Sequence, residues 1–286
     1  MGPWRRVSST AIEAGGVRGS WNRFWFAEAS PRSYALFRIA LGVFLLAYFL
    51  PLLPRVPLLF SSEGVYLPVL IPDFAPPPAV AWAVYGAFLL LLALFTVGVR
   101  TAVVAPLVLG GFLYHYLLNL AASDTAYDRL TGIFLAVACL APLDGAWAAA
   151  GGRRRPVTVF AARLLTLQLA FLYTGSGLWK LWNPQWHSGG ILELTLLGPW
   201  GSDWGRAVAT AGLPAPAWDF MAWGVIGFEI LAGPLLFVPR ARVVVLVLAL
   251  GFHLAVWVFL QIPEFLVCAT AFPLVFARRI GARPRE

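Results

Sequence analysis

The stretch "RSYALFRIALGVFLLAYFLPLLP", residues 32–54, decides the fold class. It holds the roughly 20 mostly apolar residues that a helix needs to cross the hydrocarbon layer of a bilayer. Ser30 can cap this helix, and Pro31 suits its first position. Backbone groups in hydrocarbon must be satisfied within the segment. The stretch therefore predicts a membrane-spanning helix.

The composition extends this prediction to the whole chain. Of its 286 residues, 60% are hydrophobic and 12% are charged, whereas soluble domains carry about 25% charged residues. The formal charge of +8 comes from arginines that cluster between apolar segments. That distribution is typical of membrane topology, so we expect the lipid bilayer as partner and no nucleic acid.

We expect an all-α integral membrane protein with about eight transmembrane helices. A short interfacial helix in "WNRFWFAEA", residues 21–29, precedes them. The predicted spans lie at about 33–53, 79–98, 101–121, 126–143, 158–182, 217–238, 243–260 and 264–277.

The arginines also predict an orientation. If the chain starts in the cytoplasm and crosses eight times, fifteen arginines fall on the cytoplasmic side, and only Arg55 and Arg206 fall outside. We therefore predict a multi-pass protein of the cell inner (plasma) membrane with both termini cytoplasmic. Its parts are an interfacial segment at 1–29, a transmembrane domain at 30–278 and a cytoplasmic tail at 279–286.

The stretch "LYTGSGLWKLWNPQWHSGG", residues 172–190, contains Lys180, the only lysine among 21 basic residues. One interpretation is a lysine that reaches to the membrane interface among tryptophans. The other is a base, because a desolvated lysine can lose its proton and arginine cannot. The heavy use of arginine elsewhere favours the base. Gly175 and Gly177 are expected to let a neighbouring helix approach closely.

Other polar residues inside the predicted spans are candidates for a site, because polar groups in hydrocarbon are costly. Glu229 should be protonated or paired, with His253 and Arg38 as expected partners, and Arg38 and Arg163 should reach to the cytoplasmic edge. With Lys180 as the catalytic candidate, the candidate pocket or tuning residues are Tyr173, Ser176, His115, Asn119, Asp124, Arg129, Glu229 and His253. The three histidines lack zinc-binding spacing, so no metal site is expected.

Five segments in order resemble the HTTM (horizontally transferred transmembrane) domain family, which is similar to the membrane domain of vitamin K-dependent gamma-glutamyl carboxylase. They are "SPRSYALFRIALGVFLLAY", "SSEGVYLP", "SDTAYDRLTGIFLAVACLAPL", "LQLAFLYTGSGLWKLWNPQWHSGGIL" and "FEILAGPLLFVPRARVVVLVLALGFHLAV". The resemblance runs from about residue 30 to residue 278.

The resemblance implies a lyase-type membrane enzyme in which Lys180 deprotonates a reduced, vitamin K-like quinone in an outward-facing pocket. A peptide or protein would be the second substrate. Two features depart from the carboxylase: "SDTAYDR", residues 123–129, lacks its histidine, and its large lumenal domain is missing. The alternative is a non-enzymatic membrane partner in peptide maturation, export or immunity.

Overall fold

The computed structural model describes residues 16–65, 74–119, 126–149 and 157–277. These segments form helices without a named strand, and one isolated bridge joins Glu28 to Thr158. The long helices are α2 (Pro31–Phe49), α4 (Pro78–Val97), α5 (Thr101–Leu118), α7 (Ala126–Cys139), α8 (Phe160–Trp182), α11 (Ala215–Leu235) and α12 (Arg242–Leu260).

Short helices connect and close the bundle. They are α1 (Val17–Phe26), η2 (Leu50–Arg55), α3 (Val56–Phe60), η3 (Pro184–Trp186), α9 (Gly190–Leu197), α10 (Asp203–Ala209), η4 (Pro263–Leu266), α13 (Val267–Thr270) and α14 (Phe272–Val275). The prediction of an all-α protein is confirmed for the described residues.

Each of the eight predicted spans falls on helix, but not all qualify as spans by length and composition. Four described segments do: Pro31–Phe60, Pro78–Val97, Thr101–Leu118 and Arg242–Leu260. The helices α8 and α11 are long enough but carry polar residues, and α7 has only 14 residues. Several long apolar helices of this kind are typical of a multi-pass membrane protein. The number of eight spans and the orientation stay predictions.

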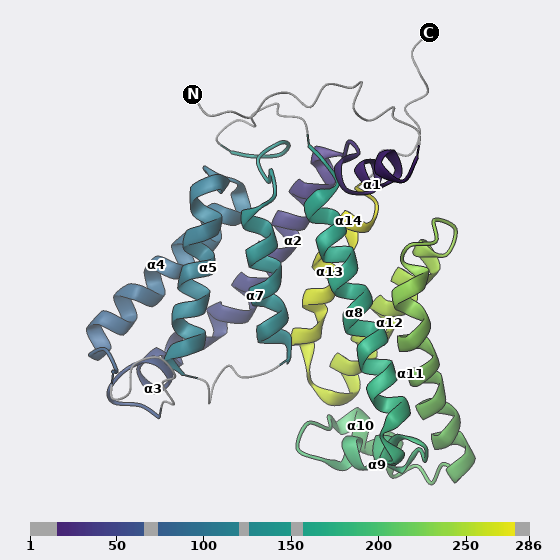
Figure 1. Ribbon diagram of the computed structural model, residues 1–286. Coiled ribbons are helices and arrows are strands. Elements are labelled where there is room, and N and C mark those ends of the chain that lie inside the picture. The colour runs from purple at the N-terminus through teal and green to yellow at the C-terminus, as the bar shows by residue number, and fades with distance from the viewer. Residues whose placement is uncertain (1–15, 66–73, 120–125, 150–156, 278–286) are drawn as a thin grey trace.

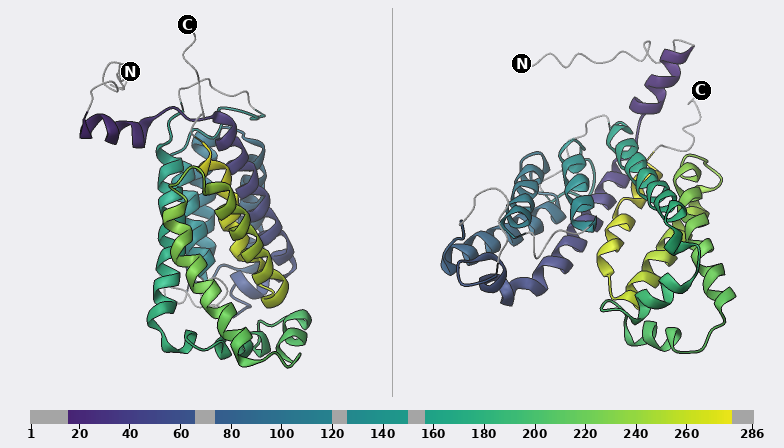
Figure 2. Two further views of the ribbon diagram at one scale, coloured as in Figure 1. Left: turned by 90° about the vertical axis from the view of Figure 1, so that its right-hand side faces the viewer. Right: turned by 60° about the horizontal axis from the view of Figure 1, so that its bottom comes forward.

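The helices form two groups that lie side by side (Figures 1 and 2). One group contains α4, α5 and α7, with α2 running beside them. The other contains α8, α11 and α12, and the chain from η4 to α14 fills the space between the groups. The short helices α9 and α10 lie at one end of the second group, and α1 lies at the opposite end of the molecule (Figure 1).

Helix α1 lies across the axis of the bundle (Figure 2). Phe26 stacks on Phe160 at the start of α8, with ring centroids 5.9 Å apart. Trp21 is 61% exposed. An exposed tryptophan on a helix that lies crosswise at the end of a bundle is typical of the membrane interface, and the interfacial position of α1 stays a prediction.

The most extensive packing between described long helices joins α8 to α11. A Cβ atom added to Gly177 would lie 2.7 Å from the backbone nitrogen of Ile230, and one added to Gly233 would lie 2.6 Å from the carbonyl oxygen of Ala170. The two helices therefore meet through positions that only glycine fills without strain. The prediction for Gly177 is confirmed. The prediction for Gly175 is wrong, because this residue is exposed and an added Cβ meets nothing within 4 Å.

Arg38 is fully buried, so the prediction of a head group that is solvated at the cytoplasmic edge is wrong. Its Nε donates to the carbonyl of Thr96 at 3.2 Å, and its two Nη groups donate to the carbonyls of Leu143 at 2.6 Å and Trp147 at 2.5 Å. Arg38 thus satisfies carbonyls at the end of α4 and in the turn after α7. A guanidinium has enough donors in a fixed plane to serve several carbonyls together.

We expect Gly177→Ala to lower the free energy of unfolding by about 1–3 kcal/mol, because the new methyl group meets backbone atoms of α11 that cannot turn aside. Gly175→Ala is the matched control and should not destabilise the protein, since its methyl group enters open space. The measurement is unfolding of the purified protein in mixed detergent micelles. Equal effects of the two substitutions would contradict the described packing.

Arg38→Met should destabilise the protein by about 1–3 kcal/mol or more, because it leaves several buried carbonyls without donors. Arg32→Met replaces an exposed arginine in the first turn of the same helix and should have little effect. The same unfolding measurement distinguishes them. A tolerated Arg38→Met would show that water replaces the guanidinium.

Candidate functional site

Lys180 is held by two hydrogen bonds near the end of α8. Its Nζ donates to Ser176 Oγ at 2.7 Å and to Glu229 Oε2 at 2.6 Å. The side chain of Lys180 is 12% exposed and that of Glu229 is 6% exposed. The lysine therefore makes a nearly buried ion pair and does not extend into the solvent.

The sequence explains how the three groups meet. Ser176 and Lys180 are four residues apart, so they lie one above the other on the same face of α8. Glu229 comes from the middle of α11. Its Cβ lies 3.0 Å from the position that a Cβ of Gly177 would take. The absent side chain at Gly177 thus brings the carboxylate within reach of the ammonium group.

An aromatic ring covers the other side of the ammonium group. Lys180 Nζ lies 4.9 Å from the ring centroid of Trp186, a distance at which a cation is attracted to the ring face. Trp186 belongs to η3, whose start is fixed by a hydrogen bond from the backbone N–H of Gln185 to Asn183 Oδ1. The crowding of tryptophans around Lys180 in the sequence is the signal for this contact.

The prediction that Glu229 pairs with His253 or Arg38 is wrong. Arg38 lies among the carbonyls of Thr96, Leu143 and Trp147, and His253 bonds to Tyr173. The lysine itself is the partner of Glu229.

Tyr173 and His253 form a second buried pair. The Tyr173 hydroxyl and His253 Nε2 are 2.8 Å apart, and both residues are almost completely buried. His253 Nδ1 is also buried and has no hydrogen-bond partner among the described residues. Tyr173 lies on the same helix as Ser176 and Lys180, two turns before Lys180. An unsatisfied buried nitrogen is unfavourable, so the contact with Tyr173 is the one that stabilises this ring.

His115 and Asn119 belong to the other group of helices (Figure 1). His115 Nδ1 bonds to the carbonyl of Gly111 at 2.7 Å, and Phe60, Tyr85 and Phe88 surround the ring. Asn119 follows the last residue of α5, and its Nδ2 donates to the carbonyls of Leu59 and Val65.

These contacts hold His115 and Asn119 against backbone carbonyls of their own group of helices. They do not bring either residue to Lys180. Arg129 is exposed on α7, and Asp124 lies outside the described residues. The structure thus joins Ser176 and Glu229 to Lys180, and it joins Tyr173 to His253.

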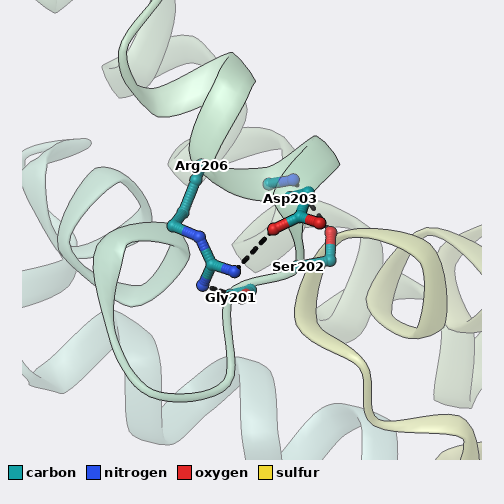
Figure 3. Close-up of polar contacts among 5 residues, drawn as sticks. Gly201, Ser202, Asp203 and Arg206 are labelled. Carbon is teal, nitrogen blue, oxygen red and sulfur yellow. Dashed lines mark hydrogen bonds and ion pairs between the residues drawn. The ribbon is translucent and has the colours of Figure 1, made fainter.

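The segment between α8 and α11 closes the end of the bundle beside Lys180. Ser202 caps α10 by accepting a hydrogen bond from the N–H of Gly205 at 2.9 Å, and Arg206 bonds to Asp203 Oδ1 at 2.8 Å and to the carbonyl of Gly201 (Figure 3). Gly189 N–H donates to Asp219 Oδ1 at 2.7 Å, which ties this segment to α11. Within the described ranges, no three His, Cys, Asp or Glu side chains gather closely enough to hold a metal ion.

Comparison with known families supplies one match. The family model described as HTTM domain matches residues 26–279, which is most of the chain. No curated protein and no solved structure matches this chain.

Removing one member of the Lys180–Glu229 pair should be strongly destabilising, because the other charge stays buried without a partner. We expect Lys180→Met and Glu229→Leu each to cost about 3–5 kcal/mol of unfolding free energy. The double substitution should recover most of that loss, because two apolar residues need no partner. Asp203→Asn, in the exposed pair with Arg206, is the control and should hardly change stability. Additive effects of the two single substitutions would contradict the pairing.

Proposed function

This chain belongs to the HTTM domain family, and on that premise we propose that it is a membrane enzyme with Lys180 as its base. The observation that carries the proposal is the nearly buried contact of 2.6 Å between Lys180 Nζ and Glu229 Oε2. The expected substrate is a reduced quinone, with a peptide or protein as the group that reacts further. The arginine distribution favours the cell inner (plasma) membrane.

The proposal requires the proton of Lys180 to pass to Glu229. Removing both charges from water costs several kcal/mol per ion, and the attraction between the charges has to offset that cost. Because the two atoms are in hydrogen-bond contact, the proton can move to Glu229 without a rearrangement. Lys180 is then an amine that can take a proton from a substrate.

The surroundings of Lys180 suit an aromatic hydroxyl group as substrate. The Trp186 ring lies 4.9 Å from Nζ, and in this proposal the quinol ring binds beside that aromatic group. After proton transfer, the ammonium group of Lys180 stabilises the oxyanion that it has created. Ser176 Oγ holds Nζ in position from the preceding turn of α8.

Tyr173 and His253 have the role of tuning residues in this proposal. They lie deeper along α8 than Lys180, and His253 Nδ1 has capacity for one more hydrogen bond. A proton that leaves the Lys180–Glu229 pair toward the interior would meet this dyad. His115 and Asn119 have no part in this proposal, because they bond to carbonyls in the other group of helices.

A non-enzymatic partner for peptide maturation, export or immunity is the second candidate. The observation that favours it is the set of exposed aromatic side chains at the same end of the bundle: Trp182 is 78% exposed, Trp204 72% and Phe220 81%. In this function the Lys180–Glu229 pair only fastens α8 to α11. An arginine would do that equally well.

The test that separates the two functions is Lys180→Arg, which keeps a positive charge for Glu229 but cannot act as a base. In protein reconstituted with a reduced naphthoquinone and oxygen, we expect wild-type turnover and a loss of about 10²–10⁴-fold in Lys180→Arg. The readout is oxidation of the quinol. Asp203→Asn should retain the wild-type rate.

Unfolding measurements on the same samples show whether Lys180→Arg is folded. A folded Lys180→Arg protein with the wild-type rate, or a wild-type protein without turnover, would overturn the enzymatic proposal. A stable complex with a peptide that survives Lys180→Arg would support the second candidate.

A further inference from the structure

A short turn of the chain follows α8 at the end of the bundle opposite α1 (Figure 1). It comprises residues 183–188 and contains η3. The N–H of Trp186 donates to the carbonyl of Asn183 at 3.0 Å. The N–H of His187 donates to the carbonyl of Pro184 at 3.1 Å. These internal hydrogen bonds make the turn a compact unit that can move as one body.

Both ends of this turn are anchored. At the near end it continues directly from Trp182, the last residue of α8. At the far end Gly189 is buried, and its N–H donates to Asp219 Oδ1 of α11 at 2.7 Å. A Cβ atom added to Gly189 would overlap the backbone of Trp218, so the chain lies directly against α11 at this point. The turn thus spans two fixed points, one on each helix of the site.

Between these points, His187 closes the turn through two contacts. Its Nε2 donates to the carbonyl of Leu181, in the last turn of α8, at 2.7 Å. Its ring stacks on Trp223 of α11, with the centroids 5.6 Å and the planes 22° apart. His187 is exposed, so water competes for its hydrogen bond. Segments fastened by exposed contacts are those that open locally at low cost in free energy.

Trp186 makes this turn a cover for the ammonium group of Lys180. The centroid of its ring lies 4.9 Å from Nζ, and the side chain of Lys180 is only 12% exposed. If the turn moved away from α11, the ring would leave with it. One side of Nζ would then be open to molecules outside the bundle.

We propose that residues 183–188 form a lid over Lys180, that His187 holds it closed, and that a substrate reaches the amine when the lid lifts. The two anchored ends act as hinges, and the contacts of His187 act as the fastening between them. As a route for substrate, the lid rests on the proposed function. The shielding of Lys180 by the lid is measured without turnover.

The experiment uses the fact that Lys180 is the only lysine of the chain. The purified full-length protein in detergent micelles is treated with sulfosuccinimidyl acetate, a water-soluble reagent that acetylates amines. Mass spectrometry follows the acetylation of the peptide that contains Lys180. Because only an uncovered amine reacts, the labelling rate follows the population of the open lid when opening and closing are fast.

We expect His187→Ala to raise the labelling rate about five-fold, the effect of losing one typical hydrogen bond. Trp186→Ala should raise the rate at least as much, because it removes the cover itself. Trp186→Ala/His187→Ala should label no faster than Trp186→Ala, since His187 acts by holding Trp186 in place. Gln185→Ala is the matched control on the same turn. Its side chain is exposed and its bond to Asn183 comes from the backbone, so the rate should change less than two-fold.

Trp223→Ala keeps the proposal testable if His187→Ala does not fold, because it removes the stacking partner of His187 and should also raise the rate. Unfolding measurements identify any increase that comes from global unfolding. A wild-type labelling rate in folded His187→Ala and Trp223→Ala would overturn the lid, and so would an equal effect of His187→Ala with and without Trp186.

The labelling separates the lid from the proposed enzymatic activity. Faster labelling of the variants in a protein without quinol oxidation would support the lid and reject only the enzyme. Unchanged labelling in a protein that oxidises quinol would reject only the lid.

Discussion

The close approach of α8 and α11 is the constraint on which the candidate site depends. Helices inside a membrane gain little from the hydrophobic effect, so they associate through packing and polar contacts. Here Gly177 and Gly233 remove the side chains that would separate the two backbones. The gap closes enough for Glu229 on one helix to meet Lys180 on the other. The packing at the two glycines therefore makes the Lys180–Glu229 ion pair possible.

Burial makes this pair different from the exposed pair of Arg206 and Asp203. Both pairs have short contacts, at 2.6 Å and 2.8 Å, but the side chain of Asp203 is 97% exposed, whereas that of Glu229 is 6% exposed. Water screens the first pair and makes it weak. In the second pair, the cost of desolvation opposes the attraction of the charges. The proposal of Lys180 as a base depends on that balance.

The buried basic residues described here are stabilised by different kinds of contact. Arg38 is surrounded by carbonyls at a helix end, where unsatisfied acceptors gather. Lys180 has a carboxylate, a hydroxyl and a ring face. Arg163 is partly buried and bonds to the carbonyl of Phe24 in the crosswise helix α1. A carboxylate thus balances the charge of Lys180, whereas neutral carbonyls stabilise Arg38.

The sequence by itself determined the all-α class and the positions of the helices. These follow from apolar run length and from the 3.6-residue period, which are local properties of the chain. It could not determine that Lys180 pairs with Glu229, that Arg38 bonds to carbonyls or that Gly175 faces open space. Such contacts join residues far apart in the chain, and they depend on which faces of two helices meet. Only the tertiary structure decided that, because the rotation of each helix in the bundle is set by its packing against the others.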